Sequence, residues 1–151
     1  MEPSIDQHKH FMSLAIKEAM KAYDQDEVPI GCVIVHNNMI IAKGYNQTQT
    51  LKDATAHAEI IALTSAFVHL NSKILKNCTI YITVEPCAMC AGAIRWAQIE
   101  TLVYGAPEEK CGFSLYSPSI LHPKTDVING VEADTCALII RQFFEEKRAK
   151  S

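Results

Sequence analysis

Hydrophobic residues recur at helical spacing in the first part of the chain. Between Asp6 and Tyr23, apolar residues every three or four positions are separated by lysine and glutamate, the pattern of an amphipathic helix. The pattern then changes to short β-branched runs, "IGCVIV" at 30–35 and "MIIA" at 39–42, with His36-Asn37-Asn38 between them. Because asparagine tolerates positive φ, these two runs predict a β-hairpin.

After the hairpin, strand-like and helix-like segments alternate. Strands are predicted at 79–84, 101–105 and, more weakly, 127–131, and helices at 57–70, 87–97 and 135–148. Asp134 is well placed to be the N-cap of the last helix. The alternation predicts an α/β fold with three layers (α-β-α), in which a mixed central sheet of about five strands is flanked by helices. Pro107 to Thr125, with three prolines, is predicted to be one long irregular connection.

Length and composition narrow the class of protein. The 151 residues suit a single domain, 1–151, with 48% hydrophobic and 21% charged residues. No apolar run approaches the roughly 20 residues of a membrane span, and "MEPSIDQHKH" has no secretory pattern, so we expect a cytoplasmic protein without a membrane partner. A net charge of −3 argues against broad nonspecific binding of nucleic acid, which leaves a local contact open.

Six cysteines in a chain without a secretory signal indicate buried thiols or metal ligands more than disulfides. Three of them lie in or beside apolar runs and are predicted to be core residues: Cys32, Cys78 and Cys136. Only Cys87 and Cys90 are closely spaced. Pro86 comes directly before them, after a predicted strand, where a residue without an N–H suits the start of a helix.

Two helix starts carry the residues with metal-binding chemistry. Cys87 and Cys90 lie on one face of a first helical turn, where the helix dipole favours thiolates. In "TAHAEIIA", His57 opens another helix, and its neighbour Glu59 points to nearly the opposite side of that helix. Both residues can nevertheless serve a site that lies just beyond the helix end. Histidine and two cysteines are three zinc ligands, which leave the fourth position for water, as in catalytic zinc sites.

Glu59 is then expected to be a neighbour of the fourth position and not a ligand. Zinc lowers the pKa of a bound water to about 7, and an adjacent carboxylate can accept that proton and pass it on. The sequence therefore predicts a hydrolytic zinc site.

The combination of His-x-Glu with Pro-Cys-x-x-Cys resembles the zinc-dependent nucleobase deaminases. Further segments resemble the bacterial tRNA-specific adenosine deaminases within the cytidine and deoxycytidylate deaminase superfamily, from Glu27 to Arg148: "EVPIGCVIV", "GYNQT", "TAHAEIIAL", "TIYITVEPCAMCAGAI", "VYGA", "LHP" and "FFEEKR". The resemblance implies a cytidine-deaminase-like fold and a homodimer. It also implies that the wobble adenosine of a tRNA anticodon stem-loop is converted to inosine, with release of ammonia.

The resemblance also implies roles for individual residues. His57, Cys87 and Cys90 correspond to the Zn²⁺ ligands and Glu59 to the proton shuttle. Asn46 would hydrogen-bond the flipped base, and the remaining predicted substrate-binding residues are Pro29, Ile30 and Ala58. Where relatives commonly carry Asp-x-Lys-x-Gly-Ala, residues 108–113 read Glu-Glu-Lys-Cys-Gly-Phe, which leaves open how this loop meets RNA.

Three alternatives remain at this stage. A redox pair at Cys87 and Cys90 would not require "HAE" or its spacing. A deaminase of free guanine, cytosine or a nucleoside would share the zinc motifs, although "EVPIG" and "FFEEKR" favour tRNA. A catalytically silent zinc or RNA-binding module would have no need of Glu59 beside an open metal position.

Overall fold

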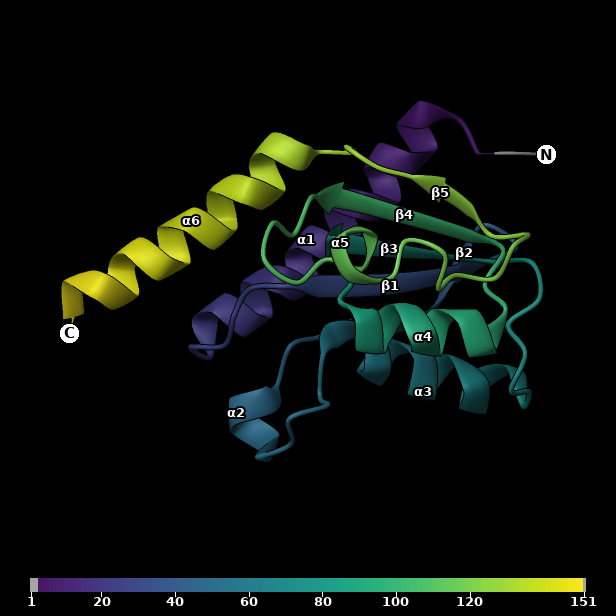
Figure 1. The fold of residues 1–151 in the computed structure, drawn as a ribbon, viewed down its shortest axis with the longest axis horizontal. Coiled ribbons are helices and arrows are strands. Elements are labelled where there is room, and N and C mark those ends of the chain that lie inside the picture. The colour runs from purple at the N-terminus through teal and green to yellow at the C-terminus, as the bar shows by residue number, and fades with distance from the viewer. Residues whose placement is uncertain (1–2, 151) are drawn as a thin grey trace.

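The computed structural model describes residues 3–150 and contains helices on both faces of one sheet (Figure 1). The elements are α1 (Ile5–Asp24), β1 (Gly31–His36), β2 (Met39–Tyr45), α2 (Thr48–Leu51), α3 (Ala58–Leu70), β3 (Cys78–Val84), α4 (Ala88–Ala97), β4 (Thr101–Ala106), α5 (Phe113–Tyr116), β5 (Asp126–Ile128) and α6 (Ala133–Lys150). In this part of the chain, none of the helices combines the length and apolar character that crossing a membrane requires.

The sheet has five strands in the order β2-β1-β3-β4-β5. Strand β1 pairs antiparallel with β2 and β3, whereas β3, β4 and β5 are parallel to one another. The prediction of a mixed five-stranded sheet between helical layers is confirmed. Cys32, near the start of β1, pairs with Ile82 near the end of β3, so the start of β1 lies at the sheet edge where β3 ends.

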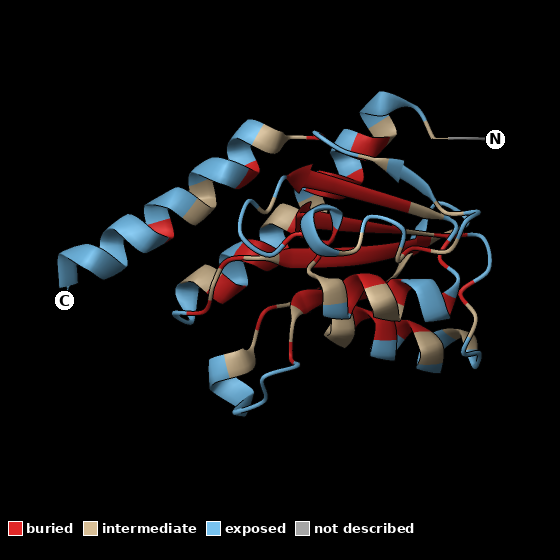
Figure 2. Cartoon of the chain, in the orientation of Figure 1, coloured by how far each residue is buried: buried red, intermediate tan, exposed pale blue. Residues whose placement is uncertain are grey.

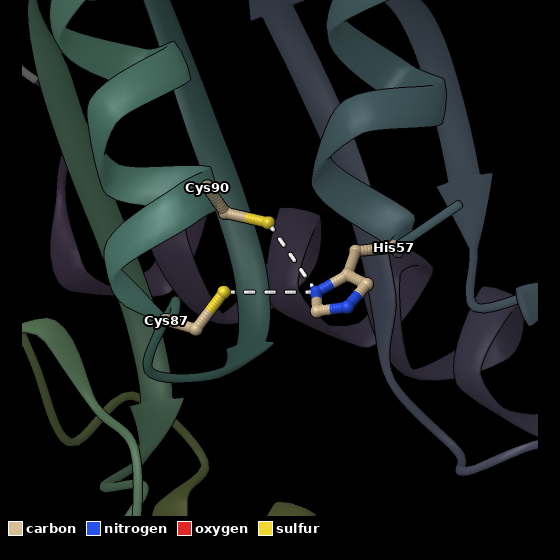
Figure 3. Close-up of side chains that lie close together, drawn as sticks. All are labelled: His57, Cys87 and Cys90. Atoms are coloured by element: carbon tan, nitrogen blue, oxygen red, sulfur yellow. Dashed lines mark hydrogen bonds between the residues drawn. The ribbon is translucent and has the colours of Figure 1, made fainter. Parts of the chain in front are cut away.

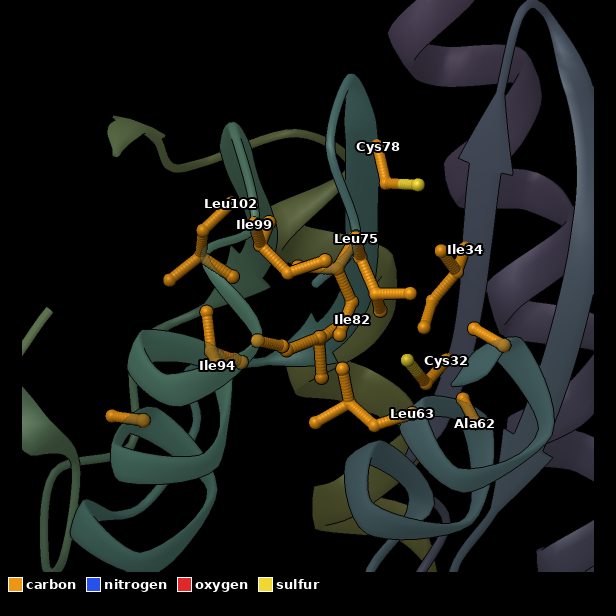
Figure 4. Packing of buried hydrophobic residues seen from close by; sticks show 14 of the residues in the cluster. Cys32, Ile34, Ala62, Leu63, Leu75, Cys78, Ile82, Ile94, Ile99 and Leu102 are labelled. Carbon is orange, nitrogen blue, oxygen red and sulfur yellow. The ribbon is translucent and has the colours of Figure 1, made fainter. Parts of the chain in front are cut away.

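Alternate residues of the central strands pack into two hydrophobic cores, one on each face of the sheet. Ile80 and Ile82 face helices α3 and α4, while Tyr81 faces α1, as the two-residue period of a strand requires. Figure 4 shows Leu63 and Ile94, from α3 and α4, packed against Ile82. Each such side chain contributes about 1.5–3 kcal/mol when it is fully buried. The central strands are accordingly buried along nearly their whole length (Figure 2).

Helix α6 differs from the other long helices because most of it is exposed. Only Cys136 and Phe143 of its described residues are buried, and Figure 1 shows the helix projecting beyond the sheet. Its carboxyl-terminal half contacts the end of α1, where Phe143 packs edge-on against Tyr23 and Lys147 pairs with Asp26 at 2.8 Å. This ion pair is exposed, so we expect it to contribute about 1 kcal/mol or less.

The structure corrects several local predictions. Asp134 lies inside the first turn of α6, which begins at Ala133, and is not its N-cap. Pro86 precedes the N-cap residue Cys87 and is not the first helical residue. The last strand is confined to 126–128, and the short helix α5 forms within the connection that was predicted to be irregular. The short helix α2 was not predicted. One-turn helices carry too few residues to show a period, which explains why they were missed.

Gly44 sets the distance between β2 and the start of α3. A Cβ atom at this position would lie 2.4 Å from the carbonyl oxygen of Ala58 and 2.9 Å from the backbone nitrogen of Ala62. Both obstacles are backbone atoms of the helix, so the helix itself would have to move. Glycine thus allows the first turn of α3 to pack directly on the strand.

We predict that Gly44→Ala destabilises the protein by about 1–3 kcal/mol, because the added methyl group forces α3 away from β2. Urea denaturation measures this change. Gly92→Ala is the matched control, since the nearest atom to a Cβ there is a side-chain carbon of Ile120 at 3.7 Å. Alanine should stabilise the interior of α4 by about 0.5–1 kcal/mol. Equal stability of the two variants would contradict this account of Gly44.

Candidate metal and catalytic site

One histidine and two cysteines from separate parts of the chain meet at the starts of α3 and α4. The Nδ1 atom of His57 lies 3.7 Å from Sγ of Cys87 and 3.5 Å from Sγ of Cys90. Figure 3 shows both thiols directed at the imidazole ring. Within residues 3–150, these three form the one group of metal-binding side chains of this kind, with ligand atoms all within 4.8 Å of one another.

The backbone explains why these side chains face one another. His57 and Cys87 are the N-cap residues of α3 and α4, with extended backbone angles (φ −72°, ψ 154° and φ −72°, ψ 174°). Neither side chain makes the capping hydrogen bond that is usual at this position. Each side chain is therefore free to point beyond its helix, and Cys90 adds a second sulfur from the first turn of α4.

The spacing of the three atoms suits a single tetrahedral metal ion. A metal with bonds of about 2.0–2.1 Å to nitrogen and 2.3 Å to sulfur separates tetrahedral ligand atoms by about 3.6 Å. The measured nitrogen to sulfur distances of 3.5 and 3.7 Å agree with that separation. Because this donor set has three members, a tetrahedral ion would keep one position for a further ligand.

The two thiols have very different affinities for protons. Hydrogen bonding from Cys90 is the main cause that lowers the pKa of Cys87 to about 4; burial opposes it and His57 reinforces it. Donation to Cys87, together with burial, raises the pKa of Cys90 well above its usual range. Contact with Cys87 also raises the pKa of His57, against the effect of burial. The cluster thus favours an anionic sulfur at neutral pH, as a metal ligand requires.

Glu59 lies in the first turn of α3 and is 4% exposed. Burial is the largest cause that raises the pKa of this carboxyl from 4.5 to about 7, and its backbone hydrogen bond and His57 only partly oppose it. A carboxyl group with a pKa near 7 can both accept and release a proton at neutral pH. The structure therefore places a carboxyl group that can exchange protons in the first turn of α3, beside the cluster of His57, Cys87 and Cys90.

Three of the residues predicted to bind substrate, Pro29, Ile30 and Asn46, lie near the start of β1 and the end of β2. The fourth, Ala58, lies at the start of α3. Asn46 follows β2, and its backbone nitrogen donates to the carbonyl oxygen of Ile30 at 3.1 Å. Pro29 is buried and Ile30 is half-buried, while Ala58 is fully buried at the start of α3.

Asn46 has an unusual hydrogen-bonding state. It is 8% exposed, and its Nδ2 donates to the carbonyl oxygen of Val28 at 3.4 Å. Its Oδ1 atom is the one buried side-chain oxygen or nitrogen without a partner among residues 3–150. Buried polar atoms are nearly always paired, so this acceptor is available to a donor from outside the protein, such as water or a ligand.

The sequence analysis missed two buried acids near the cluster, Glu27 and Glu85. Both carboxylates accept hydrogen bonds from the backbone and from a hydroxyl group of a surface segment. The available signal was an acidic residue within two positions of a proline at the end of an apolar strand or just before one, "EVP" and "VEP". The core positions of Cys32, Cys78 and Cys136 agree with the prediction, and Cys111 is exposed.

Comparison with known proteins identifies close relatives. Residues 5–106 match the family model of the cytidine and deoxycytidylate deaminase zinc-binding region. The tRNA-specific adenosine deaminase of Agrobacterium fabrum is 44% identical over 144 residues, which cover 92% of this chain and 95% of that protein. A solved structure from a study of A-to-I editing by tRNA:A34 deaminases at the wobble position matches with a TM-score of 0.80 at 41% identity, covering 86% of this chain and 98% of the other.

More distant structures share the fold alone. The guanine deaminase from Nitrosomonas europaea matches with a TM-score of 0.75 at 22% identity, over 87% of this chain and 81% of the other. The same fold therefore occurs in a protein that acts on a different substrate.

We predict that Asn46→Leu leaves the protein as stable as wild type or stabilises it by up to about 2 kcal/mol, because it removes a buried, unpaired acceptor. Thermal or urea denaturation measures the change. Thr83→Val is the matched control: Thr83 is also buried, but its hydroxyl oxygen accepts a hydrogen bond from the Gly31 nitrogen at 3.1 Å. That variant should lose about 1–2 kcal/mol. A clear loss of stability in Asn46→Leu would show that the Oδ1 acceptor is paired within the protein, or that the 3.4 Å hydrogen bond from Nδ2 to Val28 outweighs its removal.

Proposed function

Because the chain belongs to the cytidine and deoxycytidylate deaminase family, and within it to the tRNA-specific adenosine deaminases, we propose that it deaminates adenosine at the wobble position of a tRNA anticodon. In this reaction, water replaces the exocyclic amine, so adenosine and water give inosine and ammonia. The observation that carries the proposal is the placement of Glu59, a buried carboxyl with a pKa of about 7, beside a three-membered histidine and cysteine cluster.

Zinc is the proposed cofactor, with His57, Cys87 and Cys90 as its ligands. The donor types, their number and their spacing all suit zinc, and the matching family model is that of a zinc-binding region. When bound, zinc lowers the pKa of a coordinated water to about 7 and so supplies a nucleophile at neutral pH.

Glu59 would move the protons of the reaction. Its carboxylate accepts a proton from the attacking water and delivers it to the ring nitrogen next to the carbon under attack. It then assists the second transfer, to the departing amine, which leaves as ammonia. Burial suits Glu59 to this role, because a carboxyl with a pKa of about 7 changes protonation state at little cost at neutral pH.

Asn46 is the proposed recognition group for the base. An adenine edge presents an amine donor beside a ring-nitrogen acceptor, which complements the oxygen and nitrogen of an amide side chain. The unpaired Oδ1 of Asn46 supports this role, since the amine would supply the missing donor. Pro29, Ile30 and the backbone of Ala58 would form the walls of the base pocket.

The remaining features of the proposal follow from the family. We propose that residues 1–151 act as one deaminase domain, that the protein works as a homodimer in the cytoplasm, and that its partner is the anticodon stem-loop of a tRNA. The chain aligns with 95% of the Agrobacterium relative, which supports an equivalent domain organisation.

The substrate is tested by measuring ammonia released from an anticodon stem-loop that carries a wobble adenosine. The same stem-loop with guanosine at that position is the matched control, beside free adenine, guanine and cytosine. We expect turnover of the adenosine stem-loop alone. Its apparent affinity should fall about tenfold or more between 50 and 200 mM salt, because phosphate contacts release counterions. Turnover of free guanine with no salt dependence would instead establish a free-base deaminase.

The roles of the site residues are tested by comparing Glu59→Gln with His57→Ala and Cys90→Ala. Glu59→Gln should keep about one zinc per chain and a near-normal melting temperature, yet lose about 10³–10⁴-fold in single-turnover rate, because it removes only the proton carrier. The other two variants should lose zinc as well as activity, because each removes one of three ligands. Metal analysis and single-turnover kinetics measure both effects. A Glu59→Gln protein that retains its zinc and slows only a few-fold would rule out this shuttle.

A further inference from the structure

Two buried glutamates outside the metal cluster accept hydrogen bonds in the same pattern. The carboxylate of Glu27 accepts hydrogen bonds from the backbone nitrogens of Gln49 (3.1 Å) and Thr50 (2.6 Å) and from the Thr50 hydroxyl (2.7 Å). The carboxylate of Glu85 accepts from the backbone nitrogens of Glu108 (3.2 Å) and Ser114 (3.0 Å) and from the Ser114 hydroxyl (2.6 Å). Each carboxylate thus binds two amides and one hydroxyl of a single surface segment.

These hydrogen bonds are the main contacts that stabilise the two carboxylates in the interior, and the charge of Lys52 adds to them at Glu27. Glu27 is 1% exposed and Glu85 is 5% exposed. The ion pairs found in residues 3–150 involve other acids, Glu18 and Asp26. Burial of an ionised carboxylate is costly unless donors surround it, and hydrogen bonds to a charged acceptor are about twice as strong as neutral ones. Burial acts to raise the pKa of Glu27, but donation from Thr50 and Gln49 outweighs it and lowers the pKa.

Both glutamates lie next to residues of the proposed active site. Glu27 stands two residues before Pro29, and its donors belong to α2, in the connection that runs from Asn46 to His57. Glu85 stands two residues before Cys87, and its donors belong to the connection that follows β4 and contains α5. Glu27 precedes β1 and Glu85 follows β3, so both lie at the sheet edge where β3 ends.

Backbone contacts hold the second segment especially close to the metal-binding turn. The nitrogen of Phe113 donates to the carbonyl oxygen of Pro86 at 2.9 Å, and Gly112 forms a β-bridge with Cys87. A Cβ atom on Gly112 would lie 2.6 Å from the carboxyl carbon of Glu85, so a glycine is needed for this close approach. Residues 108–114 therefore pack against the turn that carries Cys87, through backbone contacts of Gly112 and Phe113 that do not involve the Ser114 hydroxyl.

The two segments present groups that suit RNA. Lys52 and Lys110 are exposed cations, and Tyr116 is an exposed aromatic residue whose hydroxyl donates to the carbonyl oxygen of Lys110 at 2.8 Å. Cations contact phosphates, and aromatic rings stack on bases. A stem-loop is far larger than a pocket for one base, so nucleotides on both sides of the target must meet the surface around the pocket.

We infer that Glu27 and Glu85 are positioning residues that hold α2 and residues 108–117 in place to receive the nucleotides flanking the reacting base. The RNA part of this inference rests on the proposed function. Neither carboxylate touches the reacting atoms, because its oxygens are occupied by donors of the segment it holds. Loss of a donor should therefore weaken the binding of RNA and leave the chemical step and the metal largely unchanged.

The inference is tested by removing one hydroxyl at a time. Thr50→Ala and Ser114→Ala should each raise KM for the adenosine stem-loop about fivefold to twentyfold, with kcat within twofold of wild type and metal content unchanged. Thr50→Ser and Ser114→Thr keep the hydroxyl and should restore KM to within about twofold. Ser72→Ala is the matched control, because the Ser72 hydroxyl hydrogen-bonds only to the backbone of Ile74, beyond the far end of α3. A fall in kcat with KM unchanged would overturn the inference.

Amide hydrogen exchange provides a readout that does not depend on activity. Thr50→Ala should speed exchange at least about tenfold in residues 48–53 alone, and Ser114→Ala in residues 108–117 alone, because each loses a stabilising contact with its glutamate. If the wild-type protein fails to deaminate the stem-loop, the proposed function fails, while local exchange still shows whether the glutamates hold the segments. Unchanged exchange in both variants would overturn the inference.

Discussion

The site depends on two helices that begin beside each other at one edge of the sheet. His57 and Cys87 occupy the N-cap positions of α3 and α4, yet neither side chain caps its helix. Each helix therefore lacks a side-chain capping hydrogen bond, which typically stabilises a helix by about 1 kcal/mol, while the imidazole and the thiol face each other. Tight packing compensates for this loss, because Gly44 lets α3 lie directly on β2 and Leu63 and Ile94 fill the layer between the helices and the sheet.

Three buried glutamates near this edge show how surroundings determine the role of one residue type. Glu27 is enclosed by three donors, which lower its pKa and keep it a permanent hydrogen-bond acceptor. Glu59 is buried with fewer compensating contacts, so burial raises its pKa to about 7 and it can exchange protons. Glu85 shares the donor arrangement of Glu27 and holds a different segment. Hydrogen bonding is thus a main difference between Glu27, which is held ionised, and Glu59, which can exchange protons.

Specificity must come from parts of the chain outside the metal cluster. A guanine deaminase shares this fold at 22% identity, which shows that the architecture accommodates more than one base. The surroundings of the cluster here include an unpaired amide oxygen at Asn46 and two segments held by buried acids. Under the proposed function, Asn46 would act on the base itself and the two segments on its neighbours.

The sequence alone determined the succession of strands and helices and the group of residues that carries the chemistry. Periodicity reports which face of a local segment is buried, so it located the long helices and the central strands. Spacing within one helical turn, as in "HAE" and "PCAMC", identified the candidate site residues His57, Glu59, Cys87 and Cys90. Only the tertiary structure decided the partners of Glu27 and Glu85, whose donors lie 22 to 29 residues away, and the unpaired state of Asn46. It also decided the first residues of α4 and α6. Hydrogen-bond partners and helix ends both depend on how distant segments pack, and a local sequence pattern does not record that packing.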